Sequence, residues 1–123
     1  MGTATGILLL EGDTLMRRLL REWLTSAGYV VFKAAPRAAV CTPGVDLVIV
    51  DLYMPRADGA RIIRAVQRSH PGTPVIAISG QFRMGLAANS PVAHELGAAR
   101  ILAKPFSRED LVAAVRALVG PRT

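Results

Sequence analysis

At residues 47–51 the chain reads LVIVD, in which four apolar residues lead directly into the acid Asp51. A short, continuously apolar run of this kind is typical of a parallel strand that helices cover on both faces. Similar runs recur along the chain with longer segments of helical period between them, and the predicted strands are Ile7–Leu10, Tyr29–Lys33, Leu47–Val50, Val75–Ile78 and Arg100–Ala103. This alternation predicts an α/β protein with a five-stranded parallel sheet.

The segments between these strands predict helices with recognisable ends. In the first helix, Met16, Leu19, Leu20 and Trp23 recur at helical spacing, so we expect Trp23 in the core and a stop at Gly28. A second, short helix is expected to begin near Pro36, and a third at the cap Asp58, with Ile62, Ile63 and Val66 facing inward. A fourth should run from Ser90-Pro91 to near Gly97. The last should begin at the cap Ser107, with Leu111, Val115 and Leu118 facing inward.

Length and composition favour a single globular domain over residues 1–123, because 123 residues can bury one core but hardly a second. No apolar run approaches the roughly 18 residues of a membrane span, and the N-terminus lacks the basic start of a signal peptide, so we expect a soluble, cytoplasmic protein. Gly120-Pro121 should end the last helix, with no output domain after it. Cys41 is the only cysteine, which excludes an internal disulfide and favours a packing role.

The net charge of +6 is compatible with nucleic acid, an anionic membrane or an acidic protein partner. The arginines of the first helix (Arg17, Arg18, Arg21) and those of a later helix (Arg61, Arg64, Arg68) are interpreted as a scatter over helix faces. They form no dense basic run and no aromatic residues alternate with them, so solvated surfaces are favoured over a nucleic-acid site.

Polar residues stop four of the predicted strands: Glu11, Asp51, Ser79 and Lys104. In an open parallel sheet the carboxyl ends of the strands share one edge, where ligands bind, so these side chains should meet in one crevice. Two carboxylates, a hydroxyl and an ammonium suit a divalent cation and a phosphoryl group, and Asp51 could then act as a nucleophile. Singly, each has an ordinary explanation, such as a loop acid, a turn former beside Gly80 or an exposed strand end.

With these motifs in order, the chain resembles the receiver family of response regulators in two-component signalling, from Ile7 to Val119. The resemblance rests on the segment LEGDTLMRR at residues 10–18, DLYMP at 51–55 with Asp58-Gly59, ISG at 78–80 and Lys104-Pro105-Phe106. It implies a flavodoxin-like, doubly wound sheet in the strand order 2-1-3-4-5. In many members the bond matching Lys104-Pro105 is cis, which proline permits at low cost.

The resemblance also implies the roles of the site residues. Asp51 is the expected phosphoacceptor, Lys104 contacts the acyl phosphate, and Ser79 is the switch hydroxyl. Glu11, Asp51 and the Tyr53 carbonyl are the expected ligands of Mg²⁺. The implied partners are a histidine kinase or phosphotransfer protein and a downstream protein target, and the only catalysis expected is of the chain's own phosphorylation and dephosphorylation.

Three departures from the family pattern affect these expectations. Gly12 replaces a second acid that usually binds the metal, so Mg²⁺ should bind weakly. Ile101 replaces the aromatic residue that changes rotamer in many members, so the switch should be transmitted in another way. The segment 81–89 is long, with Met84 and Leu86, and should form a lid or a contact surface.

Three function classes therefore remain open. The first is a stand-alone phosphorylated regulator that acts on a protein partner or in a relay. The second is a receiver-like binding module with weak or no phosphorylation, motivated by Gly12 and Ile101. The third, a nucleic-acid or flavin binder on the same fold, has no supporting motif. Asp13 is expected to cap a helix rather than bind metal, and both His70 and His94 are expected in surface or packing roles.

Overall fold

The computed structural model describes residues 5–10, 13–34, 44–51, 56–79 and 97–119, with the backbone alone at 33, 34 and 56–60. Its elements follow the predicted alternation of strands and helices. The strands are β1 (Gly6–Leu10), β2 (Val30–Ala34), β3 (Leu47–Asp51), β4 (Val75–Ser79) and β5 (Arg100–Ala103), and the described helices are α1 (Thr14–Ser26), α2 (Arg56–Ser69) and α4 (Arg108–Val119). The predicted helices near Pro36 and from Ser90-Pro91, together with Cys41, the segment 81–89 and His94, lie outside the described residues.

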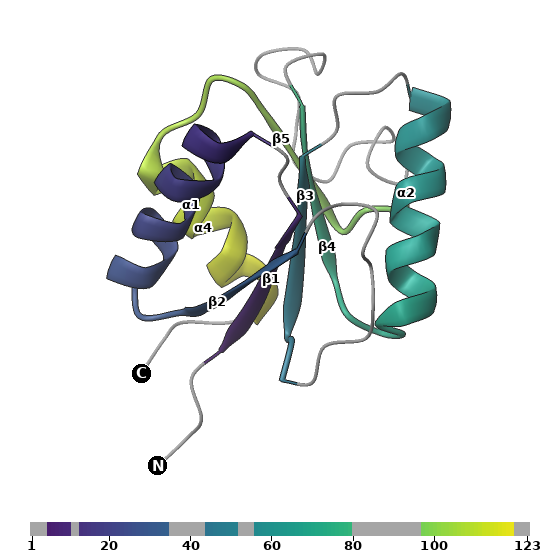
Figure 1. Ribbon diagram of the computed structural model, residues 1–123, viewed down its shortest axis with the longest axis horizontal. Coiled ribbons are helices and arrows are strands. Elements are labelled where there is room, and N and C mark those ends of the chain that lie inside the picture. Colours follow the sequence, from purple (N-terminus) through teal and green to yellow (C-terminus); the bar gives the residue numbers. More distant parts are fainter. Residues whose placement is uncertain (1–4, 11–12, 35–43, 52–55, 80–96, 120–123) are drawn as a thin grey trace.

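The strands form one parallel sheet in the order β2-β1-β3-β4-β5, as predicted. Helices α1 and α4 cover one face of this sheet and α2 covers the other (Figure 1). The strand bounds differ from the prediction by one residue at several ends. Asp51 and Ser79 are the last residues of β3 and β4 rather than the first residues after them.

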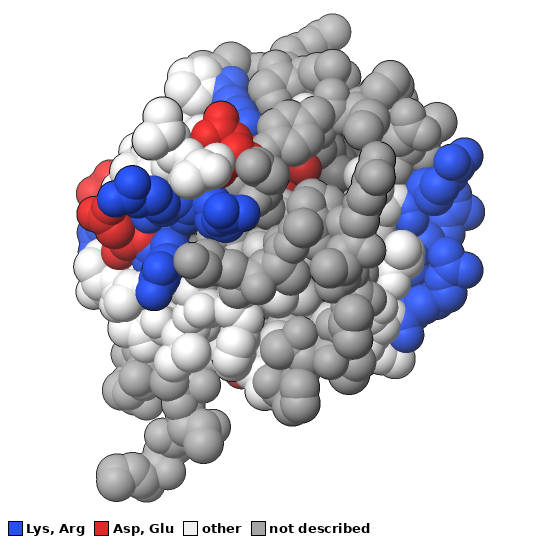
Figure 2. Space-filling view, viewed as in Figure 1, with Lys and Arg blue, Asp and Glu red and all other residues white. Residues whose placement is uncertain are grey.

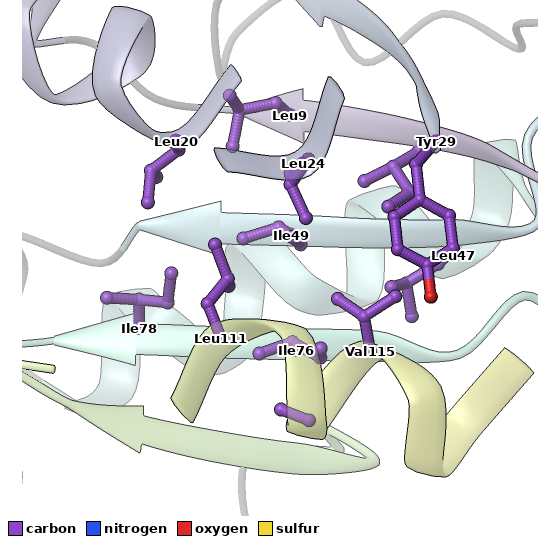
Figure 3. Packing of buried hydrophobic residues seen from close by; sticks show 12 residues of the cluster. Leu9, Leu20, Leu24, Tyr29, Leu47, Ile49, Ile76, Ile78, Leu111 and Val115 are labelled. Carbon is purple, nitrogen blue, oxygen red and sulfur yellow. The ribbon is translucent and has the colours of Figure 1, made fainter. Parts of the chain in front are cut away.

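The three central strands, β1, β3 and β4, are buried on both faces, which explains their continuous apolar sequence. Successive side chains alternate between two clusters, because a strand has a side-chain period of two. In β1, Leu8 and Leu10 join the cluster on the α2 side, whereas Ile7 and Leu9 join the cluster under α1 and α4. Figure 3 shows this second cluster, with side chains of α1 and α4 directed at those of the central strands.

Helix α1 has well-defined caps at both ends. The Asp13 carboxylate accepts hydrogen bonds from the Leu15 and Met16 backbone N–H groups, at 2.9 and 3.1 Å. At the other end Gly28, with φ of 99°, donates its N–H to the Thr25 carbonyl, and the next residue bonds back to the Leu24 carbonyl. This is a Schellman motif, in which glycine adopts the left-handed conformation without steric cost, and it confirms the predicted stop.

The expectation that Trp23 of α1 lies in the core was wrong in part. Trp23 is only half-buried and packs at the edge of the core, and Leu19 is 40% exposed. The fully buried residues are Leu20 and Leu24, one turn apart. Residues at the margin of an apolar stripe are covered only as far as neighbouring elements reach, which helical period alone does not determine.

The other two described helices largely match the prediction. Ile63 and Val66 are buried under α2 and Leu111 and Val115 under α4. The Ser107 hydroxyl accepts from the Asp110 N–H, and the Asp110 carboxylate accepts in return from the Ser107 N–H, both at 3.0 Å, which forms a capping box. The prediction that Asp58 caps α2 from outside was wrong, because Asp58 lies within the first turn of the helix.

His70, at the end of α2, is 5% exposed, so a packing role is confirmed for it. None of the described helices is both long enough and apolar enough to span a bilayer.

Candidate functional site

The sheet register brings three of the predicted site residues to one edge. Asp51 ends β3 opposite Ile78, and Ser79 follows Ile78 at the end of β4. Ser79 is in turn opposite Ala103, the last residue of β5. The ladder continues one step further, because the Lys104 N–H donates to the Ser79 carbonyl at 3.2 Å. Asp51, Ser79 and Lys104 therefore occupy neighbouring positions at the carboxyl edge, where parallel α/β sheets bind ligands.

Asp51 and Lys104 form an ion pair across this edge, with 2.6 Å between Lys104 Nζ and Asp51 Oδ2. The two partners differ in burial: the Asp51 side chain is 1% exposed and that of Lys104 is 26% exposed. Neither Asp51 oxygen has a hydrogen-bond partner of suitable geometry, so the contact is a charge pair rather than a well-directed hydrogen bond. Within the described ranges, Lys104 is thus the one cation paired with this buried carboxylate.

One described residue of the site, Asp51, fits a magnesium ligand. Mg²⁺ is bound in proteins through one or two carboxylates together with water and phosphate oxygens. The Asp51 carboxylate is a suitable ligand, and its Oδ1 atom is buried without a hydrogen-bond partner. Within the described ranges no three acidic, histidine or cysteine side chains are grouped to hold a metal. Glu11, Tyr53 and Gly12, the other residues of the predicted metal site, lie outside those ranges.

Asp13 caps the first helix. Its Oδ1 atom accepts the two N–H groups at the start of α1, as described above. The expected capping role of Asp13 is therefore confirmed.

Sequence reasoning missed the surroundings of Lys104. Trp23 of α1 packs edge-on against Phe106, with ring centroids 6.2 Å apart. Next to this pair lies a mostly apolar groove lined by Met16, Leu19, Trp23, Lys104, Pro105 and Phe106. The motif Lys104-Pro105-Phe106 was noted for its lysine, but its contact with α1 joins distant parts of the chain and no local pattern indicates it. The Lys104-Pro105 peptide bond is cis.

Ile101 is 3% exposed and lies in the cluster on the α2 side of the sheet. An aliphatic side chain enclosed in this way cannot provide an aromatic ring that moves between buried and exposed rotamers. Ile101 in β5 therefore cannot make the rotamer change expected of the aromatic residue that it replaces.

Comparison with known proteins agrees with this geometry. The family described as "Response regulator receiver domain" matches residues 7–116. The regulatory protein VirG of Agrobacterium fabrum is 34% identical over 94% of this chain, and the transcriptional regulatory protein ResD of Bacillus subtilis is 32% identical over 94%. These alignments cover 46% and 48% of the two relatives, so the chain spans about half the length of the curated relatives it matches.

Solved structures show the same fold. A CheY-like receiver domain protein from Methanospirillum hungatei superposes with a TM-score of 0.76 at 23% identity, covering 94% of this chain and 93% of that one. The receiver domain of the sensor histidine kinase PA1611 from Pseudomonas aeruginosa superposes with a TM-score of 0.75 at 26% identity, covering 96% and 99%, and carries a magnesium ion in its active-site cleft. With its sheet order, its site edge and a family match over most of its length, the chain belongs to the response regulator receiver domains of two-component signalling.

Proposed function

We propose that Asp51 accepts a phosphoryl group from the phosphohistidine of a histidine kinase or phosphotransfer protein, and that the modified chain presents a changed surface to a downstream protein. The observation that carries this proposal is the ion pair between buried Asp51 and Lys104 at the carboxyl edge of the sheet. A carboxylate that is deeply buried and paired, among the described residues, with one partly exposed lysine is costly to maintain for stability alone. Its position at the ligand-binding edge favours a chemical role.

In the proposed transfer, an Asp51 carboxylate oxygen attacks the phosphorus of the donor. A P–O bond forms as the P–N bond of the phosphohistidine breaks, and the electron pair of the broken bond remains on the imidazole nitrogen, which takes a proton from solvent. The product is an acyl phosphate on Asp51 and a neutral donor histidine. Catalysis of such a transfer consists chiefly of positioning and charge stabilisation.

The neighbouring residues can supply both. Lys104 would exchange its contact with the carboxylate for one with a phosphoryl oxygen, and the Ser79 hydroxyl, one strand away, would donate to another. Bound Mg²⁺ would offset the negative charge that Asp51 and the phosphoryl oxygens bring together. Following the family resemblance, Glu11, Asp51 and the Tyr53 carbonyl would hold it.

Access is a separate requirement. With the Asp51 side chain 1% exposed, the donor cannot reach the carboxylate in the described arrangement. Transfer therefore includes a step in which the carboxylate becomes accessible. Lys104 is the more exposed partner, so its displacement would open one side of Asp51.

Incubation with acetyl phosphate and Mg²⁺, followed by intact mass measurement, tests the proposal. Wild type should gain one phosphoryl mass and Asp51→Asn none. Asp13→Asn is a matched control, because it makes the same substitution at another acid while asparagine still caps a helix. This variant should label like wild type.

Unlabelled wild type with an intact fold would instead support the second class, a receiver-like module that binds its partners without phosphorylation. Labelling of Asp51→Asn to the wild-type extent would place the phosphate on another residue.

A further inference from the structure

The outer face of α2 carries a line of arginines. Arg61, Arg64 and Arg68 are all exposed and stand at positions i, i+3 and i+7. At 3.6 residues per turn these positions lie within about 60° of one another and extend ~10 Å along the helix. The scatter over faces expected from the sequence was wrong for this helix. Figure 2 shows the result as a continuous basic area over α2 with no acidic side chain visible among the arginines.

Among the described residues, no acid neutralises this arginine line. Helix α2 contains four arginines and a single acid, Asp58 in its first turn. Across the described part of the chain, Arg61, Arg64 and Arg68 make no ion pair or side-chain hydrogen bond. The basic residues of α1 differ, because Arg18 and Arg21 line a surface hollow together with Glu22.

The fold does not need these three charges. Helix α2 is held to the sheet by its opposite face, where Ile63 and Val66 are buried. Like charges three and four residues apart slightly destabilise a helix. Three cations that pair with no described residue thus contribute nothing to folding on the solvent side of the helix. This is the arrangement expected where a partner supplies the anions.

We propose that the arginine line of α2 is a docking surface for an acidic helix of a partner protein. A helix with Asp or Glu at i, i+3 or i+4, and i+7 repeats its charges at the same intervals as Arg61, Arg64 and Arg68. Each guanidinium can bind a carboxylate through two parallel hydrogen bonds. Ala65 borders the arginine line beside Arg61, and its small side chain permits a second helix to approach closely.

Other polyanions fit the face less well. Nucleic-acid binding surfaces usually add aromatic side chains that stack on bases, and none of the described residues of α2 is aromatic. The Gln67 amide, a group that could contact a base edge, instead donates to the Gly97 carbonyl at 2.7 Å. Membrane-surface helices insert large apolar side chains, yet those of α2 at Ile63 and Val66 are buried in the core.

The surface is also separate from the phosphoacceptor side of the molecule. Helix α2 covers the face of the sheet opposite α1 and α4 (Figure 1), whereas Trp23 and Phe106 flank Lys104 on the α1 side. The inference therefore does not rest on the proposed function of Asp51.

The test measures how tightly the full chain binds an alanine-rich helical peptide with glutamates repeated at i, i+3 and i+7. The peptide carries fluorescein, and its fluorescence anisotropy reports binding. Arg61→Gln/Arg64→Gln/Arg68→Gln should weaken binding at least about tenfold, because the three guanidinium groups act on one ligand. The matched control, Arg18→Gln/Arg21→Gln/Arg116→Gln, removes the same charge from exposed positions of α1 and α4 and should weaken binding less than about twofold. Circular dichroism verifies that both variants fold.

Equal losses in the two variants would overturn the proposal, because net charge alone would then explain binding. Equal binding of a peptide with glutamine in place of glutamate would also overturn it. Duplex DNA and vesicles of anionic lipid provide the last comparison, at matched salt. If either binds wild type more tightly than the peptide and loses binding in the α2 variant, the occupant is not an acidic helix.

Discussion

Replacing Lys104 with methionine should destabilise the protein more than replacing Asp51 with asparagine, although each change breaks the same ion pair. The reason is the difference in burial between the two side chains, 1% exposed for Asp51 and 26% for Lys104. Without Lys104, a buried carboxylate remains without its counter-charge. Without the Asp51 charge, the lysine can turn its ammonium to solvent.

The size of the effect follows from the geometry. At the 2.6 Å separation of Nζ and Oδ2, unit charges attract by about 6 kcal/mol at an effective dielectric constant near 20, before desolvation is subtracted. Removing one partner of a fully buried pair typically costs about 3–5 kcal/mol. Because Lys104 is partly hydrated, we expect Lys104→Met to lower the free energy of unfolding by about 1–3 kcal/mol and Asp51→Asn to change it by less than about 1 kcal/mol.

A double-mutant cycle in urea, followed by circular dichroism, isolates the pair. In the Asp51→Asn background, Lys104→Met should cost less than about 1 kcal/mol, since only the packing of the lysine methylenes is then lost. If Lys104→Met costs the same in both backgrounds, the two residues are not coupled and the reasoning is refuted. A cost of Asp51→Asn that exceeds that of Lys104→Met would likewise contradict the argument from burial.

Three further predictions concern other parts of the chain. Asp13→Ala should lower the free energy of unfolding by about 1 kcal/mol, because the Leu15 and Met16 N–H groups lose their acceptor, whereas Asp13→Ser should retain most of the stability; equal losses would argue against capping. Tyr29→Phe removes a buried hydroxyl that has no hydrogen-bond partner, so the free energy of unfolding measured in urea should stay the same or rise by up to ~1 kcal/mol. A clear fall in this free energy would show that the hydroxyl does stabilise the fold. Gly12→Asp should tighten Mg²⁺ in a calorimetric titration on the order of tenfold, because most of the ~4 kcal/mol of attraction at about 4 Å is offset by desolvation; no change in affinity with an intact fold would show that the missing acid does not limit binding.

Much of the architecture could be predicted from local sequence. A strand covered on both faces must be apolar at every position, so runs such as Leu47–Val50 are visible without tertiary information. The cap at Asp13 and the stop at Gly28 are also local, because their hydrogen bonds join residues a few positions apart. The site edge followed from topology, since the carboxyl ends of parallel strands lie together.

The burial of the site residues and the side chains around them depend on contacts between residues far apart in the chain. The sequence placed Asp51 and Lys104 at one edge, but the unequal burial of their side chains is a property of the folded chain. The contact between Trp23 and Phe106 joins α1 to the residues before α4, and no local period encodes it.

Helix faces show the same division between sequence and structure. The spacing of Arg61, Arg64 and Arg68 was present in the sequence, yet only the sheet determines which side of α2 is buried and which is left to solvent. Likewise, Leu19 shares the apolar stripe of α1 but remains 40% exposed at its margin. Local sequence thus determined the elements and the chemistry at their ends, and tertiary packing decided exposure, because the burial of a side chain is set by residues far away in the chain.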